Sequence, residues 1–336
     1  MKLATKNVLL LIIIFTILFG TICMIGLKIL TSFPGKSYKG DLPPETPEEA
    51  FIRSELQHHV KVLAVEIGER NFEHCDRLNA TADYIEQSFL KNGLSVQRQT
   101  YSIKNRIYYN IEAEKKGLHQ PEKIIIVGAH YDSVLGSPGA NDNSSGIAGV
   151  LLLARAFSTK SPSRTIRFVA FTNEEPPFFW TKQMGSYVYA KRCKERKENI
   201  IAMLSLEEIG YYSDEEKSQH HFPLLGFFYP SQGNFIGFVS NLSSRKLLRE
   251  VIVSFRRKKQ FPSEGGAFPG FAPGIYWSDH WAFWKMGYHA LMVTDTAFLR
   301  YPYYHTAQDT QDKIDFEKMS RVVSGLEKII DDLAGI

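Results

Sequence analysis

The sequence predicts an α/β fold with a largely parallel sheet that is buried on both faces. Two observations support this prediction. Strand-like and helix-like segments alternate along most of the chain, and three expected strands are almost entirely apolar ("IIIV", "IRFVAF" and "IIAMLSL"). Alternation is typical of a sheet with helices on both faces. Apolar runs of this length fit strands that are covered on both sides.

Each element follows from a local signal. The first helix of this region is expected at residue 47, because Thr46 can cap it, Pro47 suits its first turn and acidic residues follow. Asn92 and Gly93 end the next helix. The helices are expected at about 47–66, 78–92, 146–158, 183–193, 243–257 and 316–332. The strands are expected at about 95–102, 108–114, 123–129, 165–171, 200–206 and 290–294.

An apolar segment precedes this region. Residues 8–27 read "VLLLIIIFTILFGTICMIGL", which is 20 residues without a charge and long enough to span a bilayer. No small-x-small cleavage site follows, which favours an uncleaved anchor over a signal peptide. We therefore expect a cytoplasmic tip and transmembrane anchor over 1–31, a proline-rich linker over 32–46 and one domain over 47–336. Lysines flank the span on both sides, so charge does not decide its orientation.

Charge and cysteine content exclude other classes. The net charge of the 336 residues is only +4, and no basic stripe interleaved with aromatic residues is present, so we expect no nucleic-acid partner. Three cysteines without a C-x-x-C pair exclude a disulfide scaffold and make a zinc ribbon or a thioredoxin-like motif unexpected. Cys75 and Cys193 can either pair or remain free thiols. The oligomeric state cannot be read from these features.

Acids and histidines follow four of the expected strands, where ligands bind in open α/β sheets. They lack cysteine, so they suit a catalytic zinc site better than a structural one. There are enough for two metal ions, which need a bridging carboxylate, with one acid left over. Because neighbours in a chain diverge, one of Glu174 and Glu175 can bind metal while the other acts as general base. The residues are His130, Asp132, Asp142, Glu174, Glu175, Glu207, Glu208 and His305.

Six motifs in this order resemble metallopeptidase family 28, the dizinc aminopeptidases, over about residues 47–332. They are "GAHYDS", "GANDNSSG", "FTNEEPP", "LEEIGYY", "SDHWAFW" and "YYHTAQDT". The resemblance implies a three-layer fold with a mixed, mostly parallel sheet between helices. It also implies a membrane-anchored, bacterial-type zinc exopeptidase that removes N-terminal residues from peptides with two zinc ions. By the same analogy, the catalytic domain of 47–336 is expected in the periplasm or outside the cell.

The resemblance also assigns roles to individual residues. Glu174 corresponds to the general base, and Asp132 to the acid that orients a zinc-bound histidine. Tyr211, Tyr212, Tyr303 and Tyr304 flank ligands, so one of them can stabilise an oxyanion. The expected zinc ligands are His130 and Glu207 for one ion, Glu175 and His305 for the other, and Asp142 as the bridge.

Some assignments remain open at this stage. Glu207 is chosen over its neighbour Glu208, although the family commonly has Asp there, which leaves the substrate class open between aminopeptidase and carboxypeptidase. Asp279 and His280 either support the site or form a helix cap with a packed ring. Five aromatic residues either line a substrate pocket or pack in the core: Phe178, Phe179, Trp180, Tyr212 and Tyr304.

Two other functions compete with the aminopeptidase. Glutaminyl cyclase resembles the same family but uses one zinc, and "EEPPFFW" followed by "MGS" is similar to its loop. That enzyme typically has Trp before the last histidine, where this chain has Tyr304. A non-catalytic binding protein on the same fold would have lost ligands, and none is lost here. The number of bound zinc ions discriminates between the first two.

Overall fold

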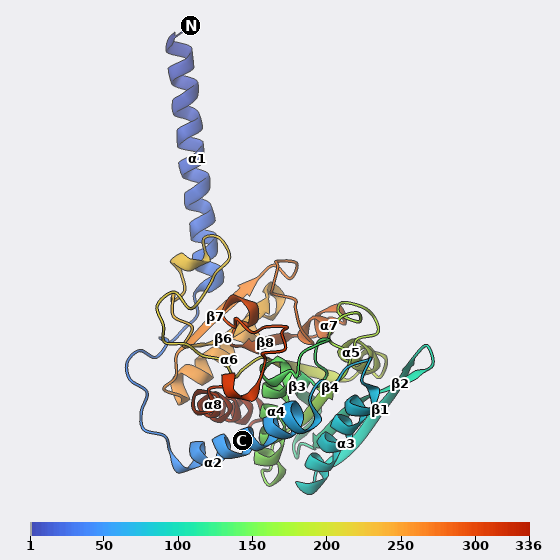
Figure 1. The fold of residues 1–336 in the computed structure, drawn as a ribbon. Coiled ribbons are helices and arrows are strands. Elements are labelled where there is room, and N and C mark those ends of the chain that lie inside the picture. Colours follow the sequence, from blue (N-terminus) through green and yellow to red (C-terminus); the bar gives the residue numbers. More distant parts are fainter. Residues whose placement is uncertain (1) are drawn as a thin grey trace.

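An eight-stranded mixed sheet forms the centre of the domain (Figure 1). The computed structural model describes residues 2–336. The sheet order is β1-β2-β4-β3-β5-β8-β6-β7. The pairs β3–β4, β3–β5, β5–β8 and β6–β7 are parallel, and the others are antiparallel. The strands are β1 Ser95–Ile103, β2 Arg106–Lys115, β3 Gln120–His130, β4 Arg164–Phe171, β5 Asn199–Glu207, β6 Ile236–Asn241, β7 Ser263–Phe268 and β8 Ala290–Thr294.

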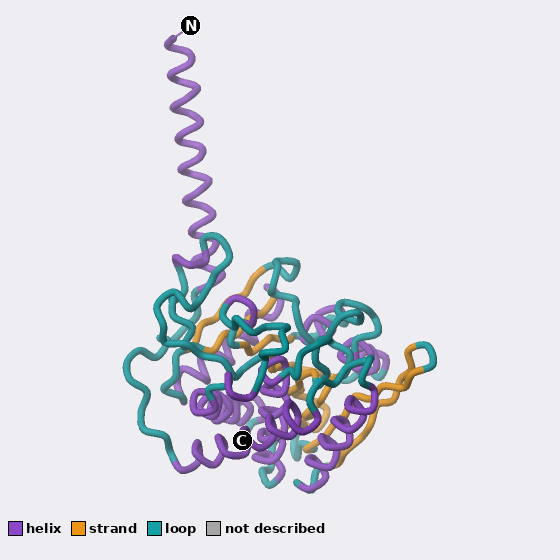
Figure 2. Tube along the Cα trace, in the orientation of Figure 1, coloured by secondary structure: helices purple, strands orange, loops and turns teal. Residues whose placement is uncertain are grey.

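Helices cover both faces of the sheet, as the three-layer prediction requires (Figure 2). The larger layer contains α2 Pro47–Val60, α3 Cys75–Lys91, α4 Gly146–Ser158, α6 Arg245–Lys258 and α8 Phe316–Ala334. A π-helical turn, Lys61–Ile67, extends α2. The opposite face carries α5 Gly185–Glu195 and α7 His280–Lys285.

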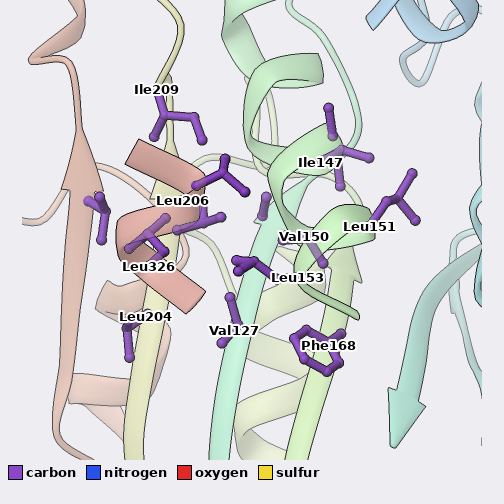
Figure 3. Packing of buried hydrophobic residues seen from close by; sticks show 14 of the residues in the cluster. Val127, Ile147, Val150, Leu151, Leu153, Phe168, Leu204, Leu206, Ile209 and Leu326 are labelled. Carbon is purple, nitrogen blue, oxygen red and sulfur yellow. The ribbon is translucent and has the colours of Figure 1, made fainter. Parts of the chain in front are cut away.

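The central strands alternate between these two layers. Leu204 and Leu206 of β5 face the larger layer, where α4 contributes Val150 and Leu153 (Figure 3). Met203, the residue before Leu204, packs instead with α5 and α7. Because side chains alternate along a strand, Ser205 and Glu207 lie on the same face as Met203. The sheet therefore directs Glu207 away from the main core.

The N-terminal helix α1, Lys2–Thr31, projects from the domain (Figure 1). Its segment Leu9–Thr31 has a mean hydropathy of 2.8 and is long and apolar enough to cross a membrane. The chain after this helix is held against the domain. Arg245 of α6 donates to the carbonyl oxygens of Ile29 and Ser32 at 2.6 and 3.1 Å, and its guanidinium lies over the ring of Phe33.

Every helix and strand expected from the sequence is present, with ends shifted by a few residues. Three elements were not predicted: β6, β7 and the short helix α7. The sequence of β7, "SEGGAF", contains two glycines, which are unfavourable in strands. Cys75 and Cys193 do not pair, and both are free thiols.

Candidate active site

The predicted site residues come together where four neighbouring strands end. In the order β4-β3-β5-β8, these strands form the middle of the sheet. His130 is the last residue of β3 and Glu207 the last of β5. Glu174 and Glu175 follow β4, and His305 lies in the loop after β8. All are buried except His305, whose side chain is 31% exposed.

Two groups of possible ligands share Asp142. One oxygen of Asp142 lies 3.3 Å from Nε2 of His130, and that nitrogen lies 3.5 Å from the Glu207 carboxylate. The other oxygen of Asp142 lies 3.2 Å from Nε2 of His305, which is 3.4 Å from the Glu175 carboxylate. Each group is compact enough to hold a metal ion. Asp142 is thus positioned between two potential ion sites.

The donor atoms themselves fit a cation. Nε2 of His130, Oδ1 of Asp142 and Oε1 of Glu175 are buried without a hydrogen-bond partner. A buried polar atom without a partner carries a free-energy cost, which a bound ion would remove. Imidazole nitrogen and carboxylate oxygen are ligands that zinc accepts. The residues present therefore fit zinc.

The pKa shifts of the buried site residues also favour a bound cation. Burial raises the pKa of Glu174 and Glu175 well above the usual range, and neighbouring carboxylates raise both further. Burial alone would lower the pKa of His130, but the carboxylates of Glu207, Asp132 and Asp142 outweigh it and raise this pKa. Burial would also raise the pKa of Asp142, yet both histidines hold it below its usual range. The pocket holds more buried carboxyl groups than cationic side chains, and a bound cation would offset the cost of ionising them.

Asp132 connects the ends of β3 and β4. Its two carboxylate oxygens accept hydrogen bonds from the backbone N–H groups of Glu174 and Glu175, both at 3.1 Å. Nδ1 of His130 lies 3.2 Å from the backbone oxygen of Asp132 and 3.5 Å from its carboxylate. Asp132 is therefore placed to orient His130, and it also fixes the two glutamates.

Glu207 and Glu208 diverge. Glu207 accepts a hydrogen bond of 2.6 Å from Ser278 and faces His130. Glu208 turns away and accepts from the side-chain amide of Asn141 at 3.0 Å. Of the two, Glu207 is the one beside the possible ligands.

Arg70, which sequence reasoning missed, shapes the glycine-rich loop. Its buried guanidinium donates to the carbonyl oxygens of Tyr131 at 2.6 Å, Pro138 at 2.6 Å and Gly139 at 3.0 Å. Gly139 has a φ of 62°, which glycine adopts without strain, and a Cβ there would collide with the backbone oxygen of Asp142. Arg70 and this turn fold the loop back so that Asp142 reaches His130.

Asp309 was also missed. Its carboxylate accepts from the backbone N–H groups of Asn141 at 2.8 Å and Asp142 at 3.1 Å, and from the hydroxyl of Tyr301 at 2.7 Å. Asp309 thereby fixes the backbone that carries Asp142. It lies in "YYHTAQDT", four residues after His305, so its place in that motif was an available signal.

Asp279 is buried beside the site. Its carboxylate oxygens have no hydrogen-bond partner and do not cap α7. Burial raises the pKa of Asp279 to about 7. His280 is a packed ring, because it lies 4.6 Å from the ring of Trp284 and contacts the carbonyl of Ile275 at 2.7 Å. Asp279 therefore stands at the N-cap position of α7 without a side-chain capping bond, and His280 is a packed ring.

A cavity of about 910 Å³, part of it open to solvent, adjoins Glu207 and Tyr304. The ring of Tyr304 stacks on His305 with centroids 3.8 Å apart. Of the five aromatic candidates, all within the described part of the chain, Tyr304 alone lines this cavity.

The other four aromatic residues lie elsewhere. Phe178 packs in the core against Phe72 and Tyr108. Tyr212 is buried and donates to the carbonyl of Ile209. Phe179 and Trp180 stack on each other at 5.1 Å. The expected pocket role is therefore not met by Phe178 and Tyr212, because both were needed to fill the core.

Comparisons with known proteins show the family and the fold. The model of peptidase family M28 matches residues 110–330. The uncharacterized protein YfbL of Escherichia coli K12 is 37% identical over 292 residues, covering 84% of this chain and 88% of YfbL. BSAP, a zinc aminopeptidase from Bacillus subtilis, has a TM-score of 0.69 at 16% identity, covering 88% of this chain and 96% of BSAP. A glutaminyl cyclase of Porphyromonas gingivalis has a TM-score of 0.62 at 16% identity, covering 84% and 98%. The predicted fold class is confirmed, and the chain belongs to peptidase family M28.

Proposed function

We propose that this chain is a zinc-dependent aminopeptidase with two zinc ions. The observation that supports it best is Asp142, whose two oxygens face two separate groups of possible ligands. His130 and Glu207 would hold one ion, Glu175 and His305 the other, and Asp142 would bridge them. When bound, the ions would polarise the scissile carbonyl and lower the pKa of the attacking water.

Glu174 is the proposed general base. It belongs to neither ligand group, although it is adjacent to Glu175 and its backbone is fixed by Asp132. It accepts a proton from the attacking water and returns it to the nitrogen of the leaving amine. Burial and the surrounding carboxylates raise its pKa, which makes it a stronger base than an exposed glutamate.

The bridging role of Asp142 can be tested by metal content. The purified protein should hold about two zinc ions per chain. Asp142→Asn should lose both zinc ions more readily than His130→Ala does, because a bridging carboxylate binds both ions. His130 is a proposed ligand of one ion only. Elemental analysis on the same preparations measures this. Full zinc occupancy in Asp142→Asn would remove Asp142 from the bridge.

Glutaminyl cyclase is the second candidate, favoured by the shared fold with the enzyme from P. gingivalis. It would need one zinc, whereas this chain has both His130 and Glu207 available for a further ion. Release of free amino acids from peptides, without formation of pyroglutamate from N-terminal glutamine, would support the aminopeptidase. The opposite result would support the cyclase.

We also propose that α1 anchors the protein in a membrane, with a linker over 32–46 and the catalytic domain of 47–336 outside the cytoplasm. The long apolar segment Leu9–Thr31 supports the anchor. Protease added to intact spheroplasts should therefore degrade the domain. A domain that is degraded only after lysis would reverse the orientation.

A further inference from the structure

One part of the sheet lies beyond the α-helices that cover the face with Glu207. Helices α5 and α7 cover β4, β3 and β5 on the face that carries Glu207. The cluster that they form on this face contains no residue of β6 or β7, and the cavity beside the possible ligands is lined by residues of these two strands. The cavity therefore extends along the sheet, away from the metal-binding residues.

The pairing of residues between neighbouring strands gives the length of the cavity. Glu207 of β5 pairs with Thr294 of β8, Thr294 with Gly237 of β6, and Gly237 with Glu264 of β7. All four residues line the cavity. Adjacent strands are about 4.8 Å apart, so three spacings span about 14 Å. An extended chain advances about 1.2 Å per bond, so about twelve bonded atoms would fill this length. No amino-acid side chain is that long.

The lining is suited to a hydrocarbon chain. Loops complete the cavity with Phe222, Leu225, Tyr229, Ile275, Trp277 and Phe298. Two of the polar side chains in the wall, Gln219 and Glu264, already have partners, whereas the ring N–H of Trp277 has none. Gln219 bonds Arg300 at 2.8 Å and Thr296 at 2.9 Å, and the Glu264 carboxylate lies 3.8 Å from the Arg256 guanidinium. An apolar ligand would therefore leave few polar groups unpaired.

The far end of the cavity lies where α1 joins the domain. The hydroxyl of Tyr229 donates to the carbonyl of Gly265 in β7. A Cβ on Gly265 would meet Ile252 of α6 and the ring of Phe33, two residues after α1, on the opposite face of this strand. The loop that carries Tyr229 lies beside the base of α1 (Figure 1). It exposes Leu224 and Phe227, which are 49% and 75% exposed. Exposed apolar side chains of this kind favour contact with a membrane surface.

We propose that this site hydrolyses membrane-derived N-acyl amines, whose linear acyl chain of about ten to twelve carbons lies in this cavity. This inference rests on the proposed function, because the same ligand groups and Glu174 would act on the amide. The oxygen of water bonds to the carbonyl carbon, the carbon–nitrogen bond breaks, and the water's proton moves to the departing nitrogen. The products are a fatty acid and an amine, and water is the only co-reactant.

The test is a chain-length series on the zinc-loaded, full-length protein. Straight-chain acyl p-nitroanilides of 4 to 16 carbons are compared with leucine p-nitroanilide. Each methylene that leaves water favours binding by up to about fourfold. We expect kcat/KM to rise at least tenfold between 4 and 10 carbons and to level off beyond about 12. Equal kcat/KM across the series, or no turnover of acyl anilides while leucine anilide is cleaved, would overturn the inference. Hydrolysis of neither class would overturn the proposed function itself.

A matched pair of variants locates the chain. Leu225 lines the cavity from a 3-10 helix, Leu225–Phe227. Leu242 lies in another, Leu242–Ser244, and is exposed outside the cavity. Leu225→Trp should lower the ratio of long-chain to short-chain kcat/KM at least tenfold, and Leu242→Trp should leave this ratio at the parent value. Val239→Phe, at the centre of the cavity floor, provides a second obstruction should Leu225→Trp fold poorly. An unchanged ratio in a folded obstructed variant would contradict the placement.

Discussion

Glu174 and Glu175 are neighbours in the chain but differ in their surroundings. The Glu175 carboxylate lies 3.4 Å from Nε2 of His305, within a group that can hold a metal ion. Glu174 belongs to no such group, and its backbone N–H is held by Asp132. The same residue type therefore has two proposed tasks: one glutamate binds an ion and the other moves a proton.

This difference gives a prediction for two isosteric variants. Glu174→Gln should keep zinc and fold but lose 10² to 10⁴-fold in kcat, roughly 3–5 kcal/mol of barrier, because an amide cannot accept the proton. KM should change less, since the proton moves only in the transition state. Glu175→Gln should weaken zinc binding as well. Release of p-nitroaniline and zinc content are measured on the same samples.

The opposite pattern would exchange the roles. If Glu174→Gln keeps near-full activity while Glu175→Gln is inactive with both ions bound, Glu175 is the base. If both variants match the parent, the reaction takes place elsewhere.

The sequence predicted the residues of this site that lie at strand ends, because a strand fixes where its last side chain goes. His130 and Glu207 are of this kind. It did not predict Arg70 or Asp309, which bond to backbone atoms of the loop that carries Asp142. Which carbonyl or N–H a distant side chain meets depends on the folded loop. Arg70 lies in no motif, and the motif that contains Asp309 does not show which backbone groups this residue bonds.

At the scale of elements, the predicted helices and central strands all formed because their apolar patterns were long and regular. β6 and β7 escaped prediction, since β7 has glycines at two of its six positions. The two glycines allow other side chains to pack closely against this strand. Gly265 packs beside Phe33, and Gly266 beside Tyr229. β6 and β7 form the floor of the cavity. A continuous apolar face on these strands would have needed a helix to cover it.

The short helix α7 makes stability depend on pH. Burial lowers the pKa of His280, its first residue, to about 4. An unfolded histidine titrates near 6.5. As pH falls from about 6.5 toward 4, the unfolded chain gains a proton that the folded chain does not, so stability is lost over this window. The contribution of His280 to the free energy of unfolding should fall by about 2 kcal/mol between pH 7.5 and 5.

Urea unfolding at both pH values measures this loss. His280→Gln keeps a donor for the carbonyl of Ile275 but cannot be protonated. Between pH 7.5 and 5, the free energy of unfolding of this variant should therefore fall by about 2 kcal/mol less than that of the parent. His289→Gln is the control, because His289 is exposed. Equal pH dependence in the parent and His280→Gln would show that His280 takes no part.

At the scale of the whole molecule, composition and periodicity predicted an apolar helix followed by an α/β fold, and both are present. How the segment between them lies was not predictable. Besides the contacts of Arg245, Arg256 donates to the carbonyls of Phe33, Pro34 and Gly35 at 3.1–3.3 Å. Ser37 accepts from the backbone of Ser263 at 2.9 Å. The first residues after α1 are therefore docked on the domain, and Leu42 further along also packs against the core.

Two truncations separate the docked segment from the anchor. A chain starting at Ser32 loses the apolar helix but keeps Phe33 and the acceptors of Arg256, so it should be soluble, zinc-loaded and active. A chain starting at Glu45 loses these contacts as well but keeps Thr46, which caps α2. Exposing the surface under Phe33 and removing three acceptors from a half-buried guanidinium should cost about 2–3 kcal/mol. For a domain of this size the Tm should fall by about 4–10 °C. Differential scanning calorimetry compares the two, and equal Tm values would mean that the docked segment adds nothing to stability.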